Sequence, residues 1–68
     1  MGDAALAEPM LYGLDEKGRA AFSEALAGVA QADLRAVAER HLLNWPVVEI
    51  WDGSLCVVRL RRKPALAD

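Results

Sequence analysis

The distribution of apolar and polar positions predicts two helices in the first two thirds of the chain. From Leu14 onward, apolar or small residues recur at intervals of three and four, which is the spacing of one helix face. This spacing predicts a first helix over residues 14–28, with Gly28 at its end. A second helix is predicted over residues 31–44, where one apolar stripe contains Leu34, Val37, Ala38, His41 and Leu42.

The last third of the chain predicts a β-hairpin over residues 47–62. Two apolar runs surround the dipeptide Asp52-Gly53, a combination typical of a tight turn between antiparallel strands. Two pairings of the strands are compatible with this pattern. A two-residue turn at Asp52-Gly53 places Val48 and Ile50 on one face with Leu55 and Val57. A three-residue loop that ends at Gly53, in a left-handed bulge position, aligns them instead with Cys56, Val58 and Leu60.

We favour the three-residue loop, because it leaves the inner face of the hairpin without a charged residue and places Glu49, Arg59 and Arg61 together outside. The outer face is nevertheless more apolar than an exposed two-stranded sheet should be. Two helices can cover one face of the hairpin, and the other face therefore becomes the predicted site of contact with another chain. The predicted interface residues are Val47, Trp51, Leu55 and Val57.

The remaining segments complete a single domain over residues 1–68. Residues 1–13 contain Pro9 and Gly13 without a sustained apolar period, so we expect an irregular N-terminal arm. Residues 63–68 are expected to form a flexible tail. The predicted fold class is α+β, with two antiparallel helices followed by a β-hairpin in the order α-α-β-β.

The small size of the chain predicts support from a partner. A chain of 68 residues buries only about 60% of the surface that its unfolded form exposes, which gives marginal stability. Disulfides, a metal ion or oligomerisation usually supply the missing stability. Cys56 is the only cysteine and His41 the only histidine, and these two residues alone do not make a zinc motif. No metal or cofactor is therefore expected. We therefore predict a homo-oligomer, with a dimer favoured, whose hairpin is extended or covered by a second chain.

Charge is unevenly distributed although the net charge is only -2. Half of the eight basic residues lie within five positions near the C-terminus, at Arg59, Arg61, Arg62 and Lys63. Such a cluster is suited to contact an anion or the acidic residues of a partner. Nucleic acid is the weaker expectation, because the chain is acidic overall and shows no aromatic ladder and no glycine-rich phosphate loop.

The positions of His41, Cys56 and Trp45 in the sequence are each explained by a structural role. His41 lies on the apolar stripe near a helix end, where a packed ring also suits the helix dipole. Cys56 lies among Val and Leu residues, as small buried cysteines do. Trp45 is expected to pack over the junction between the second helix and the hairpin. We therefore predict no catalytic residue.

The function predicted from these patterns is that of a small, non-catalytic interaction or regulatory module, self-associating through its C-terminal hairpin. No apolar stretch approaches the roughly 20 residues of a membrane span, and a lone thiol suits the cytoplasm, which is the expected compartment. The first alternative is a nucleic-acid accessory protein that uses the basic segment. The second is an enzyme whose site is shared between subunits.

Overall fold

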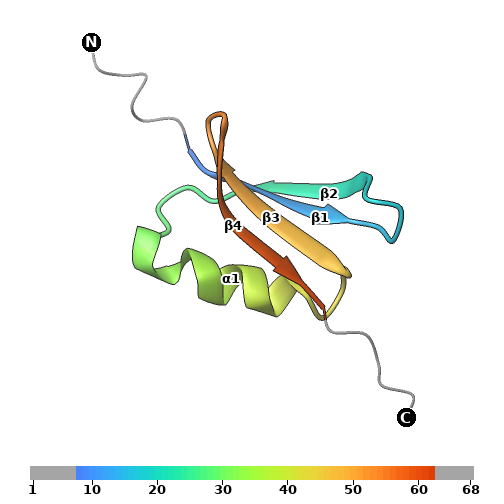
Figure 1. The fold of residues 1–68 in the computed structure, drawn as a ribbon. Coiled ribbons are helices and arrows are strands. Elements are labelled where there is room, and N and C mark those ends of the chain that lie inside the picture. The colour runs from blue at the N-terminus through green and yellow to red at the C-terminus, as the bar shows by residue number, and fades with distance from the viewer. Residues whose placement is uncertain (1–7, 63–68) are drawn as a thin grey trace.

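The computed structural model describes residues 8–62 as a four-stranded antiparallel sheet with one α-helix (Figure 1). In chain order, the elements are β1 (Met10–Leu14), β2 (Ala20–Ala25), the short 3-10 helix η2 (Gln31–Asp33), α1 (Leu34–His41), β3 (Val47–Asp52) and β4 (Leu55–Arg61). The strands lie in the order β2-β1-β3-β4. The two hairpins, β1–β2 and β3–β4, therefore meet at the centre of the sheet.

The predicted order of two helices followed by a hairpin is wrong. Residues 14–28, predicted as the first helix, contain the end of β1, a turn and β2, while residues 10–13 of the predicted irregular arm belong to β1. Residues 1–7 of that arm and the predicted tail, 63–68, lie outside the described residues.

A tight turn over residues 15–19 replaces the predicted helix. The Asp15 carboxylate accepts hydrogen bonds from the backbone N–H groups of Lys17 (2.8 Å) and Arg19 (2.9 Å). Gly18 has a φ of +82°, which glycine adopts without strain and which no α-helix contains. β1 then pairs with β2 on one side and with β3 on the other, so its backbone is satisfied along both edges.

The predicted second helix corresponds to η2 and α1. Leu34 and Ala38 are buried on the face that packs against β3 and β4. At the other end of the helix, Arg40 and His41 occupy the last turn, where positive charge suits the helix dipole. The main-chain oxygen of Leu42, just beyond the helix, accepts two hydrogen bonds from the Arg62 guanidinium, at 3.0 and 2.7 Å.

The C-terminal hairpin has most of the predicted inner face but a different turn. Val48 pairs with Leu60, and Ile50 pairs with Val58, so these four residues share one face as predicted. The register then shifts, so that Trp51 pairs with Cys56 and Asp52 with Leu55. The chain turns over Gly53 and Ser54, and the extra residue is a β-bulge at Val57 rather than part of a three-residue loop. Gly53 has the expected positive φ, +67°, but the predicted placement of Cys56 on the face of Val48 and Ile50 is wrong, because Cys56 pairs with Trp51.

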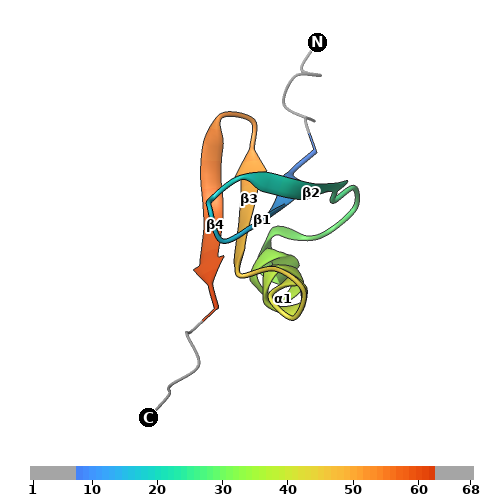
Figure 2. The ribbon, with the colours of Figure 1, turned by 90° about the vertical axis from the view of Figure 1, so that its right-hand side faces the viewer.

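The hydrophobic core lies between α1 and one face of the sheet (Figure 2). Its buried members are Leu11, Leu26, Leu34, Ala38, Val48 and Ile50. This is a small core, and partly buried side chains from β2, β4 and the helix surround it. No helix within residues 8–62 is long and apolar enough to cross a membrane.

Candidate functional site

The most extensive candidate surface is the face of the sheet opposite α1. Leu11, Gly13, Val48 and Ile50 are buried toward the helix side, and successive side chains of a strand point to opposite faces. Their neighbours in sequence therefore define the open face of the sheet, which no element within residues 8–62 covers. We define the open face by Met10, Tyr12, Leu14, Ser23, Ala25, Val47, Glu49, Trp51, Arg59 and Arg61.

The centre of the open face is apolar and comes from β1 and β3. Met10 pairs with Trp51, and Leu14 pairs with Val47, so large side chains stand beside one another across the two strands. These four residues and Tyr12 are only partly exposed. Small side chains, Ser23 and Ala25, lie on the neighbouring β2. The open face thus changes from small residues on β2 to large apolar residues at the centre.

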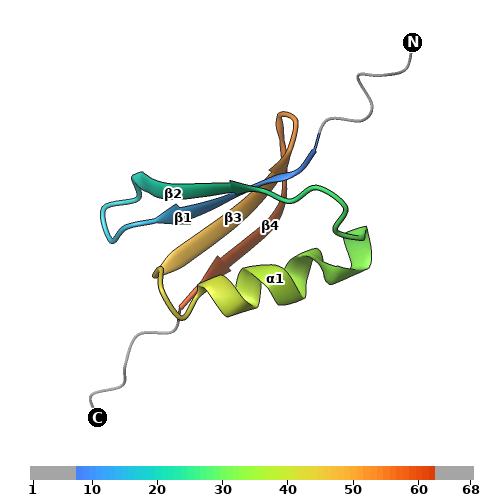
Figure 3. The ribbon, with the colours of Figure 1, turned by 180° about the vertical axis from the view of Figure 1, so that it is seen from behind.

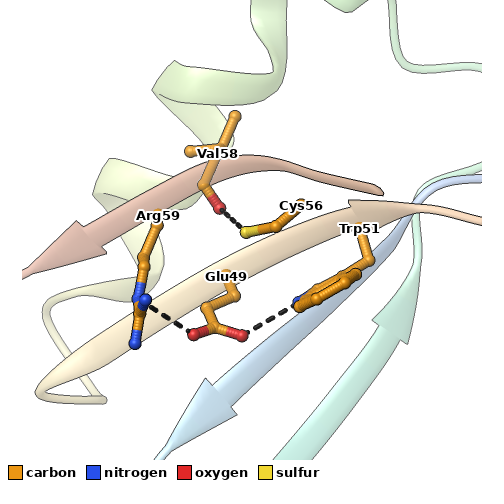
Figure 4. Close-up of polar contacts among 5 residues, drawn as sticks. All are labelled: Glu49, Trp51, Cys56, Val58 and Arg59. Atoms are coloured by element: carbon orange, nitrogen blue, oxygen red, sulfur yellow. Dashed lines mark hydrogen bonds and ion pairs between the residues drawn. The ribbon is translucent and has the colours of Figure 1, made fainter. Parts of the chain in front are cut away.

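Glu49 is the acidic residue at the centre of the open face, and it lies between Trp51 and Arg59 (Figure 4). The indole Nε1–H of Trp51 donates to Glu49 Oε1 at 2.9 Å, and Arg59 Nε lies 3.1 Å from Glu49 Oε2. The Glu49 side chain is only 13% exposed, whereas that of Arg59 is 68% exposed. The carboxylate is therefore neutralised within the chain, and its burial does not require a positively charged residue from a partner.

The predicted interface residues do not share one surface. Val47 and Trp51 lie on the open face. Leu55 is 65% exposed beside the β3–β4 turn, while Val57 is partly buried at the bulge and packs against the core. The sequence interpretation did not assign Met10, Tyr12 and Leu14 to this surface. The alternation in 10-MLYGL-14 was the signal that could have identified them.

The predicted basic cluster divides among different surroundings. Arg59 and Arg61 lie on the open face, and Arg59 is already paired with Glu49. Arg62 points instead to the end of α1, where its Nε and Nη2 bind Leu42. Lys63 lies outside the described residues. The three described arginines therefore lie in different surroundings, two on the open face and one at the end of α1.

His41 and Trp45 line the other side of the molecule and pack on Phe22. The rings of His41 and Phe22 are stacked with centroids 5.6 Å apart, and Trp45 stacks on Phe22 at 5.9 Å. His41 Nε2 also lies 3.4 Å from Glu24 Oε1, an ion pair when the imidazole is protonated. These contacts give both residues structural roles at the junction of α1, β2 and β3.

Cys56 donates its thiol to the backbone oxygen of Val58 on its own strand, at 3.4 Å. Within residues 8–62, no group of three or more His, Cys, Asp or Glu side chains is placed to hold a metal ion. The open face offers apolar area, two aromatic rings and an internally neutralised carboxylate.

Comparison of the chain with protein-family models, with curated proteins and with solved structures gave no significant match.

Proposed function

We propose that this protein is a small, non-catalytic interaction module that forms a homodimer through the open face of its sheet. The observation that supports this proposal most strongly is the apolar centre of a face that α1 leaves uncovered. In water, Met10, Tyr12, Leu14, Val47 and Trp51 expose apolar area whose burial is favourable by about 25 cal/mol per Å². The cytoplasm is the compartment we propose, since it suits the single thiol.

A second copy of the chain fits this face because the face complements itself. A two-fold axis parallel to the strands would place β1 of one copy over β3 of the other, and β4 over β2. Tyr12 would then lie over Glu49 of the partner, with the partner's Val47 and Trp51 on either side. On β4, Arg59 would lie over the small Ser23 of the partner, and Arg61 over the beginning of the partner's β2. The neutralised Glu49 would enter this interface without an unpaired charge.

The size of the face sets the expected affinity. Strands about 4.8 Å apart with a rise of about 3.3 Å per residue give four strands of this length a projected area of roughly 400 Å². Two such faces, with their side-chain relief, would bury about 1,000 Å² in total, which is at the lower end of specific interfaces. Much of the gain is offset by lost rotational and translational freedom. We therefore expect a dimer with a dissociation constant on the order of micromolar.

Sedimentation velocity at a series of concentrations tests this proposal. The wild type should shift from monomer to dimer across the micromolar range, whereas Tyr12→Lys should remain a monomer because it would bury an ammonium group at the centre of the interface. Leu43→Lys is the matched control, since Leu43 is an apolar residue that is 82% exposed away from the open face. A monomeric wild type, or equal loss of association in both variants, would contradict the proposal.

Single-stranded nucleic acid is the second candidate occupant of the open face, and one observation favours it. Tyr12 and Trp51 lie on the two central strands of a four-stranded sheet, beside Arg59 and Arg61 on β4. Aromatic rings on such a face can stack on bases, and arginines can contact the backbone. The engagement of Arg59 by Glu49 and the net charge of -2 weaken this candidate.

Quenching of tryptophan fluorescence by short single-stranded RNA tests the second candidate. The experiment uses the Trp45→Phe variant, in which all tryptophan emission comes from Trp51. Binding that weakens steeply with salt and disappears in Arg59→Ala/Arg61→Ala would support it. Unchanged Trp51 emission at low salt would exclude this function.

A further inference from the structure

β2 is the outer strand of the sheet with the less protected edge (Figure 3). Natural edge strands are usually protected by lysine, proline, bulges or arginine side chains. Both outer strands contain a bulge, at Val57 in β4 and at Ala21 near the start of β2, but only β4 also has two arginines along its length. β2 has the sequence AAFSEA, in which most side chains are small and five of the six residues are exposed. Its edge is therefore open to another strand.

The hydrogen-bond pattern identifies which groups of β2 face outward. The N–H of Leu26 donates to the oxygen of Pro9 at 2.9 Å, and residues of antiparallel strands alternate between bonding inward and outward. Along the β1–β2 register, Glu24 therefore bonds toward β1, as Leu26 does. The N–H and C=O groups of Ser23 and Ala25 point away from the sheet. They are unpaired by any strand within residues 8–62.

A groove of about 510 Å³ lies on the helix side of this edge. It exists because α1 packs against β3 and β4 and leaves the space under β2 open. Its apolar part is formed by Leu26, Val29 and Val37, and its polar part includes Glu24, Arg40 and His41. A strand added beside β2 would direct every second side chain into this groove.

The charged residues that line the groove indicate which peptide would bind there. Glu24 Oε1 and His41 Nε2 lie 3.4 Å apart and can form an ion pair with each other. Arg40, in contrast, forms no ion pair within residues 8–62. His41 stacks on Phe22 and pairs with Glu24, so the charged part of the groove lies beside this stretch of β2, and Leu26 marks the apolar end. A peptide antiparallel to β2 would pass first over the apolar end, near Leu26, and then over the Arg40 end.

From this arrangement we propose that the protein binds an extended peptide segment along β2. The peptide adds as an antiparallel fifth strand, bonded to Ser23 and Ala25, and inserts an apolar side chain over Leu26 and Val37. An acidic residue two positions later, on the same face of the peptide, pairs with Arg40. Strand addition of this kind derives affinity from the main chain and specificity from alternate side chains. The site uses the main-chain edge of β2 and the groove on the helix side of the sheet, and both remain accessible in the proposed dimer.

The test uses a labelled, end-blocked peptide in which Thr alternates with Val, Leu and Asp, with Asp two positions after the central Leu. Titration into the wild-type chain, followed by fluorescence anisotropy and by amide chemical shifts, should give a dissociation constant below about 1 mM. The largest shifts should fall on Ser23, Ala25 and the groove residues. Absence of binding, or shifts centred on β4 or on the open-face residues of β1 and β3, would overturn the proposal.

Two controls distinguish strand addition along β2 from nonspecific peptide binding. N-methylation of the peptide at the groups that face β2 should abolish binding, because it removes the donors without changing the side chains. Arg40→Glu should weaken binding by at least about fivefold, whereas Arg35→Glu, on the same helix outside the groove, should not. Equal binding of the N-methylated peptide, or equal effects of the two variants, would contradict the assigned site.

Discussion

The indole ring of Trp45 lies directly against Gly13. A Cβ placed on Gly13 would be 2.6 Å from both Cγ and Cδ1 of that ring, closer than two carbon atoms can approach. Gly13 is buried near the end of β1, and the same indole stacks on Phe22 from the paired strand. The absence of a side chain on β1 thus allows the junction between α1 and β3 to pack on the sheet.

Gly13→Ala is expected to destabilise the fold by about 1–3 kcal/mol, the usual cost of excess volume in a packed site. Urea denaturation measures this cost. In a Trp45→Leu background the same substitution should cost less, because the obstructing ring is gone. A Gly13→Ala protein as stable as the wild type would show that the Trp45 ring does not lie against Gly13 as described.

Gly53→Ala should cost about 1–2 kcal/mol in the same assay, for a different reason. No atom lies within 4 Å of a Cβ built there, so the cost comes from the φ of +67°, which residues with a Cβ rarely adopt. Gly53→Asn should cost less, because asparagine tolerates this conformation. Equal costs for the two variants would argue against a left-handed residue in the turn.

Arg62→Ala should lower the free energy of unfolding by about 1 kcal/mol, since the oxygen of Leu42 loses two hydrogen bonds from a charged donor. Arg61→Ala provides the control, because the exposed Arg61 makes no such bond in the described structure, and its effect should stay within about 0.5 kcal/mol. A neutral Arg62→Ala would show that the end of α1 does not depend on this contact.

Asp15 should contribute to pH-dependent stability. The hydrogen bond from the backbone N–H of Arg19, with a smaller contribution from that of Lys17, holds the pKa of Asp15 below its ordinary value of 3.8. Because the folded state lowers this pKa, the stabilisation is present above 3.8 and is lost as the pH falls through the folded-state pKa.

NMR titration of the Asp15 carboxyl carbon should therefore give a pKa below 3.8. Asp15→Asn should show a smaller loss of stability below that pH than the wild type, because an amide keeps the acceptor without titrating. A carboxyl pKa at or above the ordinary value would contradict the turn geometry.

Only part of this fold could be predicted from the sequence. The apolar stripe of α1 and the alternation around Asp52-Gly53 are strong signals, and both elements are present. The first hairpin was missed because Leu14, Gly18 and Phe22 imitate helical spacing, and β2 is rich in alanine, a strong helix former. Pairing with β1 overrides that preference, as tertiary context often does for strands.

The candidate site was predicted incompletely for the same reason. Val47 and Trp51 were assigned to an apolar outer surface from the hairpin alone. Because β1 was not recognised, Met10, Tyr12 and Leu14 were absent from the predicted surface. The bulge at Val57 is a further feature that the pattern did not reveal, and it turns a predicted contact residue toward the core. Val57→Lys would therefore test the fold rather than the interface.

The central claim is that two copies of the chain pack through their open faces. The most direct measurement is an isotope-filtered NOE experiment on an equimolar mixture of labelled and unlabelled protein at a concentration that favours the dimer. Packing through the open faces predicts intermolecular NOEs from the Tyr12 ring to Val47 and Trp51 of the other copy. Intermolecular NOEs confined to β2, β4 or α1, or none in a sample that sediments as a dimer, would contradict it.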